Sequence, residues 1–298
     1  MNQLRVVDFF CGAGGFSEGF RQEGFKIIMG VDNWLPAIVT HNLNHNLNDT
    51  PRSILDFEDI EKINEIPDSE IIVGSPPCVS FSTSNKGGNA DKTLGIRLIE
   101  TYLRIIAVKK HQPNSILKAW LMENVPNSRN YVKSEYTFKD LDLVNWAKKH
   151  GFKPNSTAIK VKFNGAILKA SDYGAAQARN RFVCGELVHN GAFPLPKTSE
   201  KIVTLGDIKK SLPAPLIRKK QDVRDPNYPS LLISSVDVTD HFYDTGVYEI
   251  QWQSARVAKQ NHPYMGRMSF PENELKPSRT ILLLVRQVRV NRFYINLN

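Results

Sequence analysis

The stretch LRVVDFFCGAGGF, residues 4–16, decides the fold that we expect for this chain. Residues 4–9 form a short apolar run typical of a buried strand, and glycines at positions 12, 14 and 15 follow it directly. Helical spacing then predicts a helix over residues 16–23. A glycine-rich turn between a strand and a helix lets the backbone approach a ligand at the helix N-terminus. The segment therefore predicts a ligand-binding turn that opens an α/β sheet.

Outward from this segment, apolar strands and amphipathic helices alternate through residue 185. We expect strands over 26–31, 71–73, 119–122, 161–163 and 181–183, and helices over 94–110 and 140–150. This alternation predicts a doubly wound α/β sheet. In such a sheet the ligand lies outside the carboxyl ends of the strands. Asp8, Asp32, Cys78 and Glu123 each stand at or just after a predicted strand end, so we expect them along one rim.

The composition limits the class of protein. With 298 residues, 41% of them hydrophobic, the chain can bury a sizeable core. No apolar run is long enough for a membrane span, and we expect no secretory leader, so the predicted location is the cytoplasm. Three cysteines form no disulfide or paired metal framework. The net charge of +9 is spread without a dense basic arm, which gives only modest support for a polyanionic partner.

The proline content and the periodicity of the sequence change near residue 186. Prolines cluster beyond it, at Pro194, Pro196, Pro213 and Pro215, and helical periodicity fades. We therefore expect a catalytic domain over 1–185, a smaller irregular domain over 186–280, and an atypical tail over 281–298.

Each candidate motif also has an ordinary structural explanation. The glycine-rich turn could be a simple tight turn, and Ser17 stands where a dinucleotide fingerprint needs a third glycine, which weakens a nicotinamide dehydrogenase. Asp32 nevertheless stands where a ribose would be held. Cys184 is predicted to be a buried, inert thiol, whereas two prolines hold the loop before Cys78 stiff, as suits a nucleophile. Glu123 could be an ordinary strand-end acid.

Residues 177–181, QARNR, alternate long polar side chains along an extended segment. Arg179 and Arg181 could therefore meet an anion or a base carbonyl, or they could be solvated arginines of an edge strand.

The ordered set DFFCGAGGF, VDN, GSPPCVSFS, ENV and QARNR resembles that of the DNA cytosine-5 methyltransferases, the methylases of bacterial restriction-modification systems. The match covers roughly residues 4–185. The resemblance implies a Rossmann-like methyltransferase sheet that binds S-adenosylmethionine, with a target-recognition domain after it. It also implies double-stranded DNA as the substrate and a restriction endonuclease that shares the DNA site.

The resemblance assigns a role to each site residue. Cys78 would be the nucleophile that adds to carbon 6 of a flipped cytosine, and Glu123 would hold ring nitrogen 3 and the exocyclic amine. Arg181 would touch the base carbonyl, with Arg179 and Asn124 steadying the loop. The residues implied to bind the cofactor are Phe10, Gly12, Gly14, Asp32, Asp56, Pro76 and Leu98. No metal is implied.

The sequence departs from the family at several points. Ser75 and Val79 stand where the family usually has glycine and glutamine, and an Arg-Gly pair before Leu98 is missing. The final 17 residues, LLLVRQVRVNRFYINLN, match none of the family's C-terminal motifs. Codons can be chosen for residues 285–291 such that the same DNA, read in a shifted frame, encodes Arg-Gln-Ala-Ser-Thr-Arg-Glu. That peptide resembles the way the family continues into its next motif. We therefore expect a frameshift in the gene. There are two alternatives to a frameshift. The tail could be naturally divergent, or the enzyme could be split, with a second chain that supplies the missing motifs.

Two rival functions follow. A transfer RNA methyltransferase would keep the chemistry, but the Cys-Phe-Thr tripeptide of that branch is absent. A subunit that binds DNA or cofactor without turnover would keep the fold and lose the activity.

Overall fold

A computed structural model of the chain describes residues 3–77, 92–161, 165–188, 191–192, 194–211, 223–224, 232–233, 257, 261 and 272–279. The chain forms two compact units, the first built from residues 1–168 and 180–197 and the second from 169–179 and 198–298. The assignment of 1–185, 186–280 and 281–298 to catalysis, recognition and an atypical tail stays a prediction.

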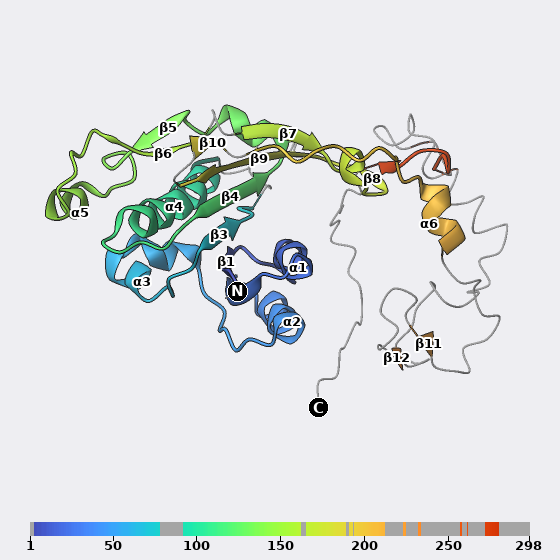
Figure 1. Cartoon of the computed structure of the whole chain (residues 1–298), viewed down its shortest axis with the longest axis horizontal. Helices are drawn as coiled ribbons and strands as arrows, with labels where there is room; N and C mark the ends of the chain where they lie inside the picture. Colours follow the sequence, from blue (N-terminus) through green and yellow to red (C-terminus); the bar gives the residue numbers. More distant parts are fainter. Residues whose placement is uncertain are drawn as a thin grey trace. The chain divides into compact units, whose positions relative to one another are not determined.

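The first unit is built on a mixed sheet with the strand order β10-β9-β4-β3-β1-β2, and β7 pairs with β9 (Figure 1). The strands are β1 (Arg5–Phe9), β2 (Lys26–Val31), β3 (Ile71–Gly74), β4 (Ala119–Asn124), β7 (Gly165–Lys169), β9 (Asn180–Leu187) and β10 (Gly191–Ala192). Strands β1 to β4 are parallel, and β9 is antiparallel to β4. The predicted α/β fold class is confirmed, and β1, β2, β3, β4 and β9 were all expected.

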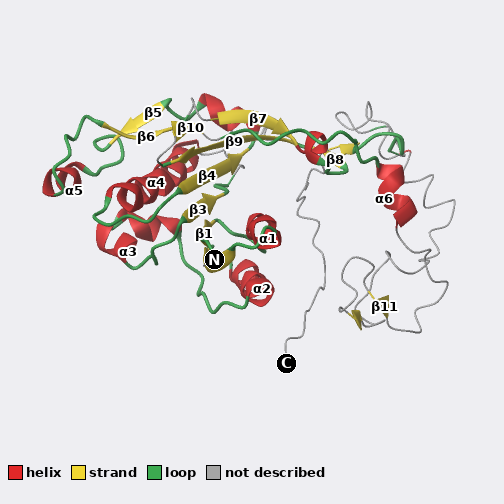
Figure 2. Cartoon of the chain, in the orientation of Figure 1, coloured by secondary structure: helices red, strands yellow, loops and turns green. Residues whose placement is uncertain are grey.

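Helices lie on both faces of this sheet (Figure 2). They are α1 (Gly15–Gln22), α2 (Leu35–His45), α3 (Ile60–Asn64) and α4 (Lys92–His111), with 3₁₀ turns η1 (Ile54–Glu58) and η2 (Pro126–Asn130). Helix α5 (Val144–Lys149) lies away from the sheet, in the segment between β5 and β6 (Figure 1). A separate hairpin joins β5 (Glu135–Thr137) and β6 (Thr157–Lys160). The helices expected over 16–23 and 94–110 are confirmed as α1 and α4.

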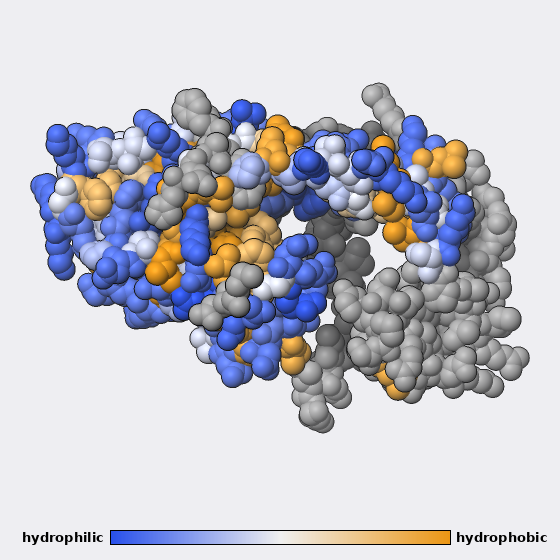
Figure 3. Space-filling view, viewed as in Figure 1, coloured by the Kyte–Doolittle hydropathy of each residue, from blue (hydrophilic) through white to orange (hydrophobic). Residues whose placement is uncertain are grey.

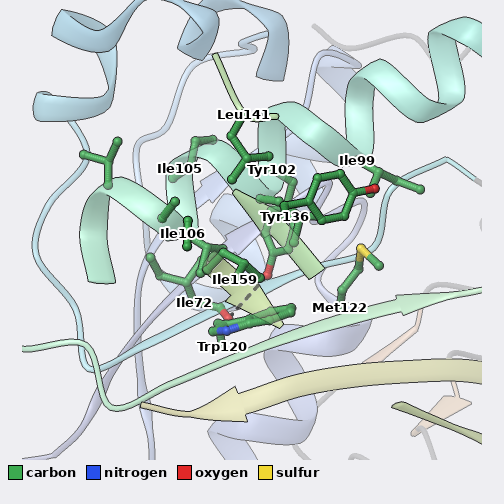
Figure 4. Packing of buried hydrophobic residues seen from close by; sticks show 14 of the residues in the cluster. Ile72, Ile99, Tyr102, Ile105, Ile106, Trp120, Met122, Tyr136, Leu141 and Ile159 are labelled. Atoms are coloured by element: carbon green, nitrogen blue, oxygen red, sulfur yellow. Dashed lines mark hydrogen bonds between the residues drawn. The ribbon is translucent and has the colours of Figure 1, made fainter. Parts of the chain in front are cut away.

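Successive side chains along each strand point to opposite faces of the sheet, and a hydrophobic core forms on each face. Val7, Ile72, Trp120 and Met122 point into the larger cluster beneath α4, and their neighbours Val6, Ile71, Val73, Ala119 and Leu121 point to the face that α1 covers. In Figure 4, Tyr102 reaches from α4 toward the strands, and its hydroxyl donates to the carbonyl of Leu121 at 2.6 Å. Figure 3 shows apolar residues gathered over the centre of this unit and hydrophilic ones at its margins.

The order of the strands determines where a ligand can bind. From β1 the chain moves outward to β2 and then returns to β3 on the other side of β1, so the order reverses between β1 and β3. Ligands of open α/β sheets bind at such a reversal, outside the carboxyl ends. The glycine-rich loop follows β1 and the Pro76–Pro77 loop follows β3 at this place.

Two expectations about the first unit are wrong. Asp8 lies near the carboxyl end of β1, as expected, but it is fully buried there and so cannot contact a ligand at the rim. The helix expected over 140–150 begins only at Val144. The carboxylate of Asp140 accepts hydrogen bonds from the backbone and hydroxyl of Thr137, and Asp142 has a φ of 54°, which no right-handed helix allows. The strand expected over 161–163 falls largely outside the described residues.

The second unit contains η4 (Ala170–Tyr173), β8 (Gln177–Ala178), α6 (Leu205–Ser211), β11 (Val223–Arg224), β12 (Leu232–Ile233) and β13 (Ser278–Arg279). Strands β8 and β13 pair in parallel, so residues far apart in the sequence meet here. Among the described residues of both units, no helix has the length and apolar character to cross a bilayer. The unusual tail over 281–298 lies outside the described residues.

Candidate active site

The glycine-rich loop after β1 takes a backbone course that only a few residue types tolerate. Gly12 and Gly14 have φ values of 53° and 98°, and Phe10 reaches 57°. A bulky residue at positive φ is strained, and such strain is concentrated at ligand-binding sites. The loop is held by hydrogen bonds from Cys11 N to the carbonyl of Val31 at 3.2 Å and from Gly14 N to the carbonyl of Cys11 at 2.9 Å.

Asp32, at the end of β2, is tied to this loop. One carboxylate oxygen accepts the backbone N–H of Gly12 at 3.0 Å, and the other accepts that of Trp34 at 2.9 Å. Each carboxylate oxygen keeps a further lone pair for a ligand. The side chain expected to hold a ribose is therefore fixed in orientation by the glycine-rich loop and by the start of α2.

A cavity of about 190 Å³ lies beside these groups. Phe10, Asp32 and Leu98, three of the predicted cofactor residues, line it. Its remaining lining residues are Val31, Asn33, Arg52, Ser53, Ile54, Ser75 and Pro77. The wall thus combines apolar side chains with a carboxylate, which suits a heterocycle that carries hydroxyl groups.

Four predicted cofactor residues lie outside that lining. Gly12 and Gly14 form the neighbouring loop, and Pro76 is buried in the segment after β3. Asp56 is exposed in η1. Sequence reasoning missed the contribution of residues 52–54. The only signal for them appears in three dimensions, where the backbone N–H of Arg52 donates to the carbonyl of Asp32 at 2.8 Å.

The carboxyl end of β4 carries Glu123 and Asn124 within the strand itself rather than after it. Nε of Arg181 lies 2.6 Å from Oε1 of Glu123, because β9 runs antiparallel beside β4. Asn124 is buried and its Nδ2 donates to the carbonyl of Pro76 at 3.1 Å. The end of β4 therefore holds both an arginine from β9 and the proline loop that follows β3.

The remaining catalytic candidates are placed only in part. Cys78 lies outside the described residues, although the described chain leads to Pro77, its neighbour in sequence. Arg179 belongs to the second compact unit and Arg181 to the first. Cys184 is buried and its thiol is free, as predicted, and burial raises its pKa far above the ordinary value. Within the described residues, no cluster of metal-binding side chains occurs.

Comparison with known proteins identifies the class. The chain matches the model of the C-5 cytosine-specific DNA methylases over residues 4–267, and it belongs to this family. The type II methyltransferase M.MthTI of Methanothermobacter thermautotrophicus is 31% identical over 257 residues, which cover 84% of this chain and 68% of that protein. M.HgiGI of Herpetosiphon aurantiacus is 37% identical over 130 residues, covering 42% of this chain and 94% of the relative.

Among solved structures, the methyltransferase EhMeth of Entamoeba histolytica is similar with a TM-score of 0.49 and 17% identity, covering 75% of this chain and 63% of that one. The family inferred from the five ordered motifs is thus confirmed by the family match. The family consists of DNA cytosine methyltransferase enzymes, which work with a methyl donor.

Proposed function

We propose that this chain transfers the methyl group of S-adenosylmethionine to carbon 5 of a cytosine that is flipped out of duplex DNA. One observation carries the proposal: the hydrogen bond from Asn124 to the carbonyl of Pro76 joins the end of β4, where Glu123 meets Arg181, to the loop that leads into Cys78. An acid and an arginine thereby lie beside the backbone that leads into Cys78, on the strands next to β3, and β3 borders the reversal of strand order.

The chemistry of the cavity supports the choice of donor. Phe10 and Leu98 offer apolar surface for an adenine ring, and Asp32 offers a carboxylate for ribose hydroxyls. Gly12 is only half-buried and leaves its backbone accessible before the N-terminal end of α1, whereas Gly14 is buried against α2. As the family resemblance implies, Asp56 would accept from the adenine amine and Pro76 would line the pocket. When bound, S-adenosylmethionine supplies an electrophilic methyl group on a sulfonium.

The residues of the chain prepare the cytosine for this transfer. The thiolate of Cys78 adds to carbon 6, and the electron pair of the 5,6 double bond makes carbon 5 nucleophilic. Glu123 holds ring nitrogen 3 and the exocyclic amine, which favours the addition. Arg181 contacts the base carbonyl, and Asn124 and Arg179 steady the surrounding loops. After methylation, loss of the proton on carbon 5 restores the double bond and expels the thiolate.

The substrate must be extrahelical, because carbon 6 is inaccessible in a stacked duplex. Flipping costs a few kcal/mol, which contacts with the pocket and the phosphate backbone must offset. We further propose that the chain acts in a bacterial restriction-modification system, in the cytoplasm, where a restriction endonuclease recognises the same DNA site. A second chain that supplies C-terminal motifs is the partner that a split enzyme would need.

The test is methyl transfer from radiolabelled S-adenosylmethionine to duplex DNA, followed by mapping of 5-methylcytosine. Cys78→Ser is expected to retain donor binding and lose transfer. Glu123→Gln is expected to slow tritium exchange at carbon 5, which reports addition at carbon 6 without the methyl step. Substantial transfer by Cys78→Ser, or failure of 5-fluorocytosine in DNA to trap Cys78 even when a C-terminal segment is supplied, would refute the mechanism.

A further inference from the structure

A buried chain of hydrogen bonds lies beneath the glycine-rich loop. Asp8 of β1, Ser17 of α1 and His41 of α2 have no solvent exposure. The hydroxyl of Ser17 donates to Oδ2 of Asp8 at 2.6 Å, and its oxygen lies 3.1 Å from Nε2 of His41. When Asp8 is ionised, the single hydroxyl proton of Ser17 goes to the carboxylate, and the Ser17 oxygen then accepts from an N–H at Nε2 of His41.

These buried hydrogen bonds connect the two ends of the glycine-rich loop. Asp8 precedes residues 10–14 and Ser17 follows them, so their hydrogen bond joins the strand before the loop to the helix after it. Asn44, also from α2, donates from Nδ2 to the carbonyl of Ala13 at 2.8 Å. The loop is therefore held from below by the buried chain and from the side by α2.

The imidazoles of α2 fill the space under the loop. A Cβ added at Gly14 would lie 2.5 Å from Nε2 of His45, and one added at Gly30 would lie 2.4 Å from Cε1 of His41. Gly14 of the glycine-rich loop and Gly30 of β2 are thus packed directly onto these two rings, whose centroids lie 4.7 Å apart. Any displacement of these rings would move the loop.

This arrangement of buried polar side chains lowers the stability of the fold, which argues against a purely structural role for it. Within the described residues, two buried atoms of this cluster have no hydrogen-bond partner, Oδ1 of Asp8 and Nδ1 of His41. Unsatisfied buried polar atoms destabilise the fold, and natural sequences keep such violations mainly at functional sites.

We propose that Asp8, Ser17, His41 and Asn44 are positioning residues of the methyl-donor site, which hold the loop over residues 10–14 in its binding geometry before the donor arrives. The inference rests on the proposed function. These residues act through the backbone of Gly12, whose N–H also orients the carboxylate of Asp32. Loss of the buried chain would therefore weaken the site that Asp32 and Phe10 form, although none of the four residues lines the cavity.

The experiment compares Ser17→Ala with Ser69→Ala. Ser69 is also a buried serine that donates one hydrogen bond, to the carbonyl of Ile71 at 3.0 Å, but it lies before β3 at the far end of the strand from the site. Calorimetry would measure the dissociation constant of S-adenosylhomocysteine, and amide hydrogen exchange without ligand would follow Gly12 and Gly14. Ser17→Ala is expected to bind about tenfold more weakly and to exchange faster at both glycines, since one hydrogen bond contributes about that factor. Ser69→Ala is expected to match the wild type in both.

Substitutions on α2 provide the second arm. His41→Leu removes the donor to Ser17 and is expected to act like Ser17→Ala, whereas His41→Gln keeps an N–H donor and is expected to recover most of the affinity. Wild-type binding and exchange in Ser17→Ala, or an equal loss in Ser69→Ala, would overturn the inference. Failure of the wild type itself to bind the donor analogue would instead refute the proposed function, while exchange at Gly12 and Gly14 would still report on the positioning.

Discussion

Nε of Arg181 lies 2.6 Å from Oε1 of Glu123, and both side chains are mostly withdrawn from solvent, with exposed fractions of 15% and 28%. Nη1 of the same arginine donates to the carbonyl of Asn180 at 2.7 Å. The guanidinium thus orients the carboxylate while it is itself anchored to the backbone of β9. Such a fork of donors is a property of arginine that lysine lacks.

Arg181→Lys is therefore expected to lower the rate of methyl transfer by at least about tenfold, because an ammonium cannot replace two diverging N–H donors. Binding of the donor analogue should be unchanged, since Arg181 does not line the cavity beside Asp32. Single-turnover kinetics would measure the rate, with Arg129→Lys on the exposed end of η2 as the matched control. A wild-type rate in Arg181→Lys would show that the contact with Glu123 has no catalytic part.

Asn124→Asp tests the link between β4 and the proline loop. The substitution keeps an oxygen for the backbone N–H of Val125 but replaces the donor to Pro76 with a second acceptor. The two facing oxygens should cost about 1–3 kcal/mol of unfolding free energy and slow methyl transfer about tenfold or more. Urea denaturation and single-turnover kinetics would measure the two effects. Asn130→Asp, at an exposed amide, is the control, and equal effects in both variants would contradict the prediction.

Gly14→Ala and Gly24→Ala separate backbone strain from contact with α2. Both glycines have positive φ, 98° and 81°, so alanine should strain each by about 1–2 kcal/mol. At Gly24 the added methyl meets nothing within 4 Å, whereas at Gly14 it meets the ring of His45. Calorimetry should therefore show weakened binding of the donor analogue only for Gly14→Ala. Equal binding by the two variants would contradict the packing of the loop on α2.

The buried acid and the buried imidazole should have opposite effects on stability as pH changes. Burial raises the pKa of Asp8 to about 7, with a smaller contribution from the charge of Asp32. Burial, and secondarily the neighbouring His45, lowers the pKa of His41 to about 4. Between about pH 5 and 6.5 the folded state holds a proton on Asp8 that the unfolded chain releases, so the Asp8 contribution to stability falls as pH rises. In the same window His41 is neutral when folded and protonated when unfolded, so its contribution rises.

The two slopes cancel in the wild type, and each should become visible when the other group is removed. Relative to the wild type, Asp8→Asn should gain up to about 1.4 kcal/mol of stability per pH unit in this window, and His41→Gln should lose a similar amount. Urea unfolding at about pH 5 and pH 6.5 would measure both differences. Because Tyr102, Asp32, His45 and Asp49 are unchanged in either variant, parallel pH profiles for the two variants would contradict the opposed titrations.

The sequence was sufficient to predict the strands that carry the chemistry, because apolar runs that end in glycine, proline or an acid are local signals. The ends of β1 and β2 were found in this way, whereas β3 and β4 run one and two residues further than expected. The start of α5 was missed, although the sequence over 140–150 has an amphipathic pattern. The side chain of Asp140 accepts a hydrogen bond from the backbone of Thr137, and the positive φ of Asp142 interrupts the helix.

The misplacement of Asp8 has a different origin. Position in a strand predicts the end at which a residue lies but not the face that covers it, and Asp8 shares the face of Val6, which α1 buries. Likewise the sequence HNLNHNLN, residues 41–48, has no local signal that places His41 and His45 under the glycine-rich loop. Residues 52–54 line the cavity only because the chain returns beside Asp32, which is a tertiary event without a local signature.

The polypeptide passes between the two compact units three times, at residues 168–169, 179–180 and 197–198. A chimaera that exchanges the second compact unit for that of a relative would therefore need three splice junctions. Replacement of everything after residue 197 would leave the short excursion over 169–179, Arg179 included, as a remnant of the original protein. Protein engineers who exchange both excursions together would keep the pairing of β8 with β13 within a single parent.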